Sequence, residues 1–171
     1  MNSFRSRTLP VLIAACFAVF ASLPATADSH VRIVRLSYIE GGVQISRGAD
    51  RAYEKAIVNL PITEGAKLKT SDGRAEVEFE DGSTLRIVPD SAVEFSHLSL
   101  RDSGAKVSEV SVTTGTAYVN FAGTKSDEFS LHFGDEKVAL ARAAHLRVIL
   151  EGHDSSVAVF KGLIQVDSPS G

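Results

Sequence analysis

The sequence predicts an all-β fold, either a two-sheet sandwich or a short β-solenoid, built from short strands that are connected mainly by hairpins. Residues 74–80 alternate strictly between charged and apolar side chains, which is the period of a half-buried strand. Turn-forming segments that contain glycine recur at short intervals, and β-branched and aromatic residues fill the stretches between them. This spacing favours a sandwich, barrel or solenoid over a fold that alternates strands with helices.

The clearest local prediction is a hairpin. Residues 74–80 form its first strand, residues 81–83 (Asp-Gly-Ser) are a turn signal, and residues 84–88 alternate again. Two earlier strands are expected at residues 43–45 and 67–70, each next to a turn that contains glycine. Three residues of the first hairpin strand are expected to face the core: Ala75, Val77 and Phe79.

The second half of the chain predicts six further strands, separated by glycine-containing turns. Their ranges are 107–112, 116–121, 128–133, 137–141, 146–150 and 157–160. Two segments compete as helices. Residues 49–58 have too few apolar positions at helical spacing, whereas residues 140–150 are rich in good helix formers. The second segment could be one helical turn that leads into a strand, and we assign it as strand.

The N-terminal region predicts a cleavable secretion signal over residues 1–27. Two arginines precede an apolar run, and Ala25-Thr26-Ala27 matches the small-residue pattern of a cleavage site. Residues 8–27 carry no charge and are long enough to span a membrane, so an uncleaved anchor is the alternative. The segment ending at Cys16 resembles a lipoprotein cleavage site, but the chain stays apolar after it, so we assign Cys16 to the apolar run.

After the signal, residues 28–167 are predicted to form one domain and residues 168–171 a linker-like end. Without the first 27 residues, the 18 Lys and Arg fall to 16 against 21 Asp and Glu, a net charge of −5. This net charge does not indicate a basic surface that would bind nucleic acid or anionic lipid. Cys16 is the one cysteine of the chain, so disulfides, thiolate metal sites and cysteine nucleophiles are not expected in the mature domain.

The sequence contains none of the motifs that identify common serine hydrolases, zinc proteases or phosphate-binding loops. Its five histidines fall in different predicted elements, with no two at the spacing of a metal pair. His132 could form a loose metal or acid–base site with Asp135 and Glu136, but a solvent-facing histidine is the preferred interpretation, because this turn looks exposed and shifted pKa values need burial. We therefore predict a protein that is not an enzyme, with no catalytic, cofactor-binding or metal-binding residues.

Two surface features remain as candidates for binding. An acidic stripe could bind cations or a basic partner, although the solvent-facing side of an amphipathic strand is the preferred interpretation. The stripe consists of Glu76, Glu78, Glu80 and Asp81. Tyr53, Tyr118 and Asn120 could form a glycan-binding surface, because exposed aromatic rings beside polar groups stack on sugars. A strand of a sandwich has one face toward the core and one toward solvent, which explains an outward-facing Tyr118 equally well.

The stretch from Gly41 to Phe121 resembles a FecR domain, a periplasmic all-β module. Turn glycines and core hydrophobic residues carry most of this resemblance, which makes them informative about fold and weak on function. The matching segments are Gly41-Gly42-Val43, residues 60–70, Gly73-Arg74-Ala75, the strand to Phe79, residues 81–87, Pro89-Asp90-Ser91, Val93, Phe95, Val110 and residues 114–117. With weaker similarity beyond Phe121 included, the resemblance extends over roughly 130 residues of the mature chain, and it is weakest in the last third.

Members of the FecR family resemble relay proteins that pass a signal from an outer-membrane receptor to an anti-sigma segment in the cytoplasm. Compared with that pattern, we expect this chain to lack the cytoplasmic segment that precedes the apolar stretch. It has Tyr53 at a position where the family often has tryptophan, and residues 143–148 in place of a late family motif. We therefore expect an exported binding or sensory module, periplasmic or secreted, that interacts with an envelope protein and is not inserted in the membrane once the signal is cleaved. A carbohydrate- or peptidoglycan-binding domain is the alternative, and an enzyme is the third.

Overall fold

The computed structural model describes residues 32–48, 51–124 and 127–168, and among these residues it contains strands and turns but no helix. The predicted signal peptide, with Cys16, lies outside the described residues, and none of the described residues belongs to a helix able to cross a membrane. The strands are β1 (Val34–Glu40), β2 (Val43–Arg47), β3 (Glu54–Lys55), β4 (Pro61–Ile62), β5 (Ala66–Thr70), β6 (Arg74–Glu78), β7 (Thr84–Ile87), β8 (Ala92–Leu100), β9 (Lys106–Phe121), β10 (Glu128–Phe133), β11 (Glu136–Leu140), β12 (Ala144–Glu151), β13 (Asp154–Lys161) and β14 (Gln165–Asp167).

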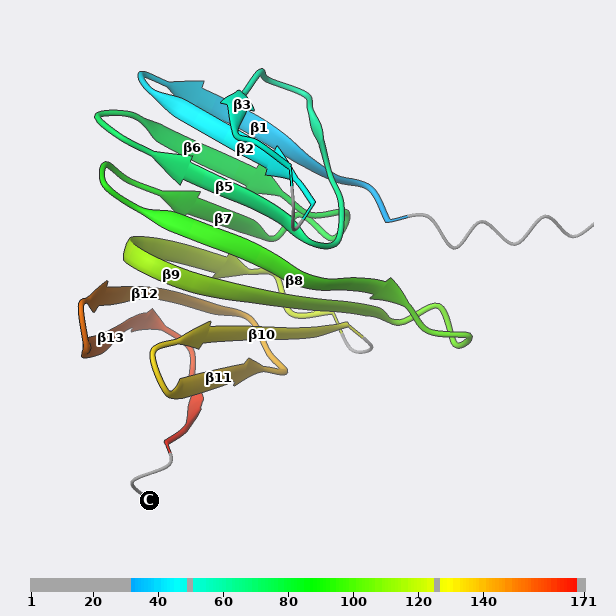
Figure 1. Ribbon diagram of the computed structural model, residues 1–171. Helices are drawn as coiled ribbons and strands as arrows, with labels where there is room; N and C mark the ends of the chain where they lie inside the picture. Colours follow the sequence, from blue (N-terminus) through cyan, green and yellow to red (C-terminus); the bar gives the residue numbers. More distant parts are fainter. Residues whose placement is uncertain (1–31, 49–50, 125–126, 169–171) are drawn as a thin grey trace, which may run out of the picture.

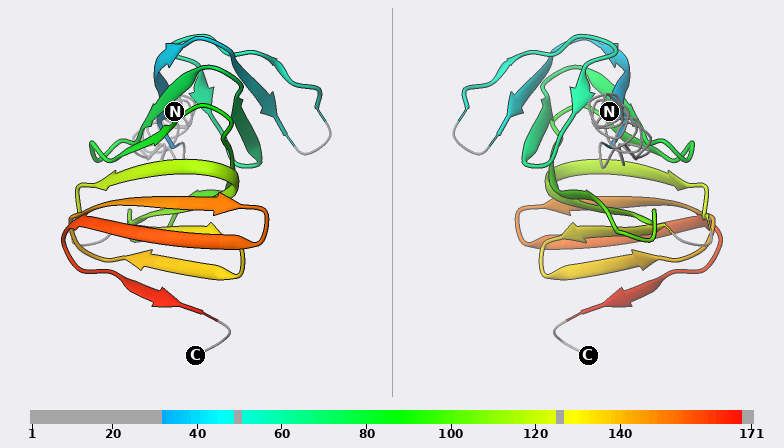
Figure 2. Two further views of the ribbon diagram at one scale, coloured as in Figure 1. Left: turned by 90° about the vertical axis from the view of Figure 1, so that its left-hand side faces the viewer. Right: turned by 90° about the vertical axis from the view of Figure 1, so that its right-hand side faces the viewer.

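The fourteen strands form one curled sheet in which β9 connects two halves (Figures 1 and 2). The first part of β9 pairs with β8 and β10, and through them with β5, β2, β3, β11 and β14. The second part pairs with β7 and β12, and through them with β6, β1, β4 and β13. The all-β prediction is confirmed. The finer prediction of a two-sheet sandwich or a short solenoid is not confirmed, because the strands are joined in a single sheet.

The sequence prediction was wrong about Gly115, which was expected to separate two strands. β9 is one strand of sixteen residues that continues through Gly115 and bends there, so that its two parts join different halves of the sheet. Gly115 has a φ of 79°, and a β-carbon at this position would lie 2.4 Å from the carbonyl oxygen of Asp90. The bend therefore needs a residue without a side chain.

The hairpin prediction is confirmed by β6 and β7, which pair through Ala75 opposite Ile87 and Val77 opposite Leu85. The assignment of residues 146–150 as strand rather than helix is also confirmed, since they lie within β12. β12 pairs with β9 on one side and with β13 on the other, and alternate residues of β12 are buried. This strand pairing outweighs the helix propensity of the segment.

The apolar side chains that alternate along the strands meet inside the curl. The three phenylalanines Phe95, Phe121 and Phe133 are among the largest fully buried residues. Phe129 packs edge-on against Phe79, with ring centroids 5.3 Å apart, so β10 is held against the hairpin. Burial on this scale stabilises a domain without disulfides, because apolar area removed from water contributes about 25 cal/mol per Å².

Candidate functional site

An open groove lies on the outer, solvent-facing side of the half-sheet formed by β1, β6, β7, β9 and β12. Its volume is about 860 Å³. It is lined by Tyr38, Arg74, Glu76, Thr84, Arg86, Val88, Tyr118, Asn120 and His145. We call it the Tyr118 groove. All of its lining residues except Val88 come from five strands, because outward positions on neighbouring strands stand side by side.

The strand register arranges the groove as two rows that cross the sheet. The first row runs from Tyr38 through Glu76, Arg86 and Tyr118 to Arg147, each residue directly opposite the next. Tyr118 thus stands between two arginines, one on each neighbouring strand. Cross-strand neighbours of this kind lie about 5 Å apart, so a ligand in the groove meets the Arg86 guanidinium and the Tyr118 phenol together.

The second row is polar and neutral at its centre. Thr84, Asn120 and His145 are directly opposite one another on β7, β9 and β12. Glu78 lies at one end of the row and Lys161 at the other. Hydroxyl, amide and imidazole groups both donate and accept hydrogen bonds, so this row suits a polar ligand of either charge.

Ion pairs hold the charged side chains of the groove. Arg86 donates to the Glu76 carboxylate, and Arg74 Nε lies 3.3 Å from Glu40 Oε2. The Tyr38 hydroxyl donates to Glu40 over 2.6 Å, and this hydrogen bond raises the pKa of the Tyr38 phenol. Ion pairs at the protein surface are weak, so a charged ligand can displace these contacts.

Arg147 differs from the other arginines of the face. Its Nε–H is buried and has no hydrogen-bond partner among the residues that the structure describes. A buried donor without a partner costs about 1–3 kcal/mol. The Arg147 Nε–H is therefore a local cost of the fold rather than a group presented to solvent.

An aromatic cluster borders the groove at the end of β13, the strand that pairs with β12. The Phe160 ring lies 6.4 Å from the Tyr118 ring with an interplanar angle of 9°, and 5.0 Å from the His145 ring. Phe160 is 55% exposed. A partly exposed aromatic side chain beside polar groups offers an apolar contact surface to a ligand that the groove binds through hydrogen bonds.

The prediction that Tyr118 and Asn120 face outward is confirmed, since the residues that alternate with them, Ala117, Val119 and Phe121, are buried. Tyr53 does not join them. It precedes β3 in the other half of the sheet, where Lys69 Nζ lies 4.0 Å from the centre of its ring. Sequence reasoning missed Arg86, His145 and Phe160 as neighbours of Tyr118, because only the register between β7, β9, β12 and β13 brings them together.

Three of the four carboxylates of the acidic stripe pair with arginines. Glu76 pairs with Arg86, and Glu78 pairs with Arg35 across 2.7 Å. The side chain of Glu80 was expected to face solvent, but it is only 15% exposed, so that part of the prediction was wrong. The three glutamates are thus paired with arginines within the fold, whereas Asp81 accepts hydrogen bonds from the backbone N–H and hydroxyl of Ser83.

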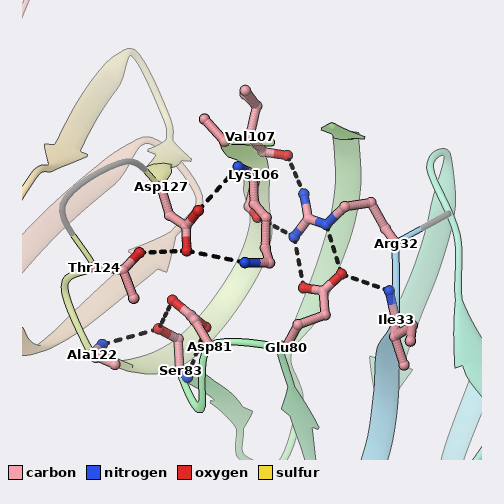
Figure 3. A network of polar contacts seen from close by, with 12 residues as sticks. Arg32, Ile33, Glu80, Asp81, Ser83, Lys106, Val107, Ala122, Thr124 and Asp127 are labelled. Atoms are coloured by element: carbon pink, nitrogen blue, oxygen red, sulfur yellow. Dashed lines mark hydrogen bonds and ion pairs between the residues drawn. The ribbon is translucent and has the colours of Figure 1, made fainter. Parts of the chain in front are cut away.

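Glu80 belongs to a clamp that holds the start of the described chain against the middle of the fold (Figure 3). Its carboxylate accepts hydrogen bonds from Arg32 Nε at 2.7 Å and from the Ile33 backbone N–H at 2.6 Å. The Arg32 guanidinium also donates to the carbonyl oxygens of Ser99 and Val107. Burial alone would raise the pKa of Glu80, but these hydrogen bonds outweigh it and lower that pKa.

A second polar cluster lies beside the clamp (Figure 3). Asp127 accepts hydrogen bonds from the Thr124 hydroxyl and from the Lys106 backbone N–H, and it also pairs with the Lys106 ammonium. Burial raises the pKa of Asp127, but these donors more than compensate and lower it. Both clusters fix loops to β9, and neither opens into the Tyr118 groove. We assign them to stability.

Comparison with known protein families identifies the chain. The family model described as FecR protein matches residues 66–165, more than half of the sequence. The chain belongs to the FecR family. The FecR match runs from β5 to the start of β14, so it includes the last third of the chain, where the resemblance read from the sequence was weakest. Tyr118, Arg86 and Phe160 all lie inside it.

Solved structures give a more distant likeness to this FecR chain. Two crystal structures of a candidate anti-sigma factor from Parabacteroides distasonis ATCC 8503, at 1.65 and 2.50 Å resolution, are 17% and 16% identical to it. Each match covers 61% of this chain and 48% of the other, with a TM-score of 0.49. The chain thus spans about half the length of those proteins. No curated protein matches it.

The FecR fold places the remaining sequence candidate, His132, on β10, where Phe129, Leu131 and Phe133 face the core. His132 stands opposite Lys137 of β11, and the turn to that strand contains Asp135. Within residues 32–48, 51–124 and 127–168, no group of three or more His, Cys, Asp or Glu is arranged to hold a metal ion.

Proposed function

We propose that this FecR protein is an exported, non-catalytic sensory or binding module of the cell envelope, and that the Tyr118 groove is where it binds its partner. Membership of the FecR family supports a regulatory role. Export is supported by the signal pattern over residues 1–27. The location that follows is the periplasm or the outside of the cell.

The observation that carries the proposal is the cross-strand row in which Tyr118 stands between Arg86 and Arg147. A tyrosine flanked by arginines is the composition found at the centre of protein interfaces, where these residue types carry much of the binding energy. An envelope protein that presents a carboxylate to this row would displace Glu76 from Arg86.

Chemical cross-linking in intact cells tests the proposal, with Arg86→Glu as the variant and Arg101→Glu as its control. The two arginines are matched, since each is more than half exposed and each pairs with one glutamate. Arg101 lies outside the groove. We expect the wild type and Arg101→Glu to recover the same envelope protein, and Arg86→Glu to lose most of it. Equal recovery by both variants would place the binding surface elsewhere.

A second candidate is carbohydrate or peptidoglycan binding, which the cluster of Tyr118, Phe160 and His145 beside Asn120 favours. Aromatic rings pack on the apolar faces of sugars while amide and imidazole groups bind hydroxyls. Sedimentation with isolated cell wall separates the two candidates. A wall-bound fraction that disappears in Asn120→Ala supports the glycan, and the absence of any wall-bound fraction rejects it while leaving the protein partner in place.

A further inference from the structure

β13 forms a long free edge of the sheet. It pairs with β12 along one side, and no other strand in the described part of the chain pairs with it. The other edges, β3, β4 and β14, have only two or three residues each, and β4 contains Pro61. Short edge strands and proline prevent pairing with further strands. β13 has eight residues and neither of these features.

The core is also open at this edge. Val157 and Val159 stand opposite the buried residues Val148 and Leu146 of β12, so they face the interior of the curl. Val159 is nevertheless 43% exposed, because no strand follows β13 to cover it. On the opposite half-sheet Val166 of β14 is 39% exposed as well. Apolar side chains along a free strand edge mark a surface that gains stability by pairing.

The charges of β13 select the orientation of a second strand. The charged residues of β13 are Asp154 at its start and Lys161 at its end, with six uncharged residues between them. An identical strand that pairs in the antiparallel direction brings each Asp154 toward the end that carries Lys161 of the other copy. Parallel pairing would bring like charges together.

We propose that β13 pairs antiparallel with β13 of a second copy of this chain, which joins two sheets into one across a two-fold axis. With Ala158 opposite Ala158 at the axis, Val157 of each copy stands opposite Val159 of the other on the core side. The contact is self-complementary, as a two-fold interface requires, and it closes both edges at once. The inference is independent of which ligand the Tyr118 groove binds.

The pairing would give the dimer two Tyr118 grooves on one continuous sheet. Counted along strands spaced about 4.8 Å apart, β9 of one copy lies five strand spacings, or about 24 Å, from β9 of the other. Phe160 links the two features, because it is part of β13 and stacks on Tyr118. A partner with two binding segments at this spacing would be held more tightly than by either groove alone.

Sedimentation of the purified chain over a range of concentrations tests the proposal, with the mass expected to rise from one chain to two. Ala158→Glu places two carboxylates opposite each other at the axis and should raise the dimer dissociation constant about fivefold. Ala158→Lys should act in the same way. An equimolar mixture of the two variants should recover the dimer, since Glu and Lys then meet; a misfolded variant would not be rescued.

Ala139→Glu is the matched control, because Ala139 is an exposed alanine in the middle of β11 that already has a strand on each side. It should leave the dissociation constant unchanged. A wild-type mass of one chain at every concentration would overturn the proposal, as would a dimer that Ala158→Glu does not weaken. If the β13 amides that point away from β12 resist hydrogen exchange in monomers, another segment of this chain covers the edge, which also overturns the proposal.

Discussion

The ring of Phe160 in β13 lies almost parallel to the ring of Tyr118 in β9, with centroids 6.4 Å apart and β12 between the two strands. The contact joins β13, an edge strand of one half-sheet, to β9, the strand that connects the two halves. It also borders the groove that we propose as the binding surface. Changes at Phe160 should therefore act on binding more than on folding.

Phe160→Ala should weaken partner binding while lowering the free energy of unfolding by only about 1 kcal/mol, the value of an aromatic pair. Its control is Ile57→Ala, because Ile57 is similarly exposed, at 60%, and lies outside the groove. Recovery of the cross-linked partner and urea unfolding measure the two effects. Loss of binding in Ile57→Ala to the same degree would show that the effect is not specific to the groove.

Glu80→Gln should destabilise the fold by about 3 kcal/mol, because it leaves the Arg32 guanidinium, 6% exposed, without its counter-charge. Glu128→Gln is the control. Glu128 pairs with Arg101 on the surface, where both side chains are more than half exposed, and its loss should cost about 1 kcal/mol or less. Urea unfolding gives both values, and equal costs would mean that the clamp contributes no more than a surface pair.

The same carboxylate predicts how stability depends on pH. The pKa values of Glu80 and Asp127 are lower in the folded protein than in the unfolded chain, so the unfolded chain binds protons first. Their contribution is complete above the unfolded pKa values, near 4, and is lost as the pH falls through the folded ones. Unfolding free energies measured from pH 7 to pH 3 should fall below about pH 5, and less steeply in Glu80→Gln. A flat profile would contradict this origin.

Gly115→Ala should cost more than Gly82→Ala, although the two glycines have φ values of 79° and 81°. Both substitutions force a side chain into the left-handed region, at about 1–2 kcal/mol. Only at Gly115 would the new β-carbon meet the backbone, 2.4 Å from the Asp90 carbonyl oxygen, whereas nothing lies within 4 Å at Gly82. Thermal unfolding of the two variants should separate them, and equal losses would show that β9 can bend without this close contact.

Much of the fold follows from local patterns. The alternation of residues 74–80 places Ala75, Val77 and Phe79 inside, and the structure confirms this. The course of β9 could not be predicted in the same way, because a glycine that bends a strand and a glycine that ends one have the same local signal. The parallel pairing of β9 with β10 likewise depends on contacts between whole strands.

The candidate site was predictable only in part. The alternation around Tyr118 and Asn120 shows that both face outward, and this is confirmed. Which residues stand beside them depends on the register of β7 and β12 against β9, and a shift of one residue would replace Arg86 and Arg147 with apolar side chains. Core packing fixes that register, so it is a property of the folded sheet rather than of any one segment.

Site-specific photo-cross-linking in living cells tests the central claim most directly. A photoreactive phenylalanine analogue at position 118 would lie in the groove, and the same analogue at position 44, an exposed residue of β2 in the other half-sheet, is the control. We predict a covalent product with one envelope protein from position 118 and none from position 44. A product from position 44 alone, or no product from position 118, would contradict the assignment of the Tyr118 groove as the binding surface.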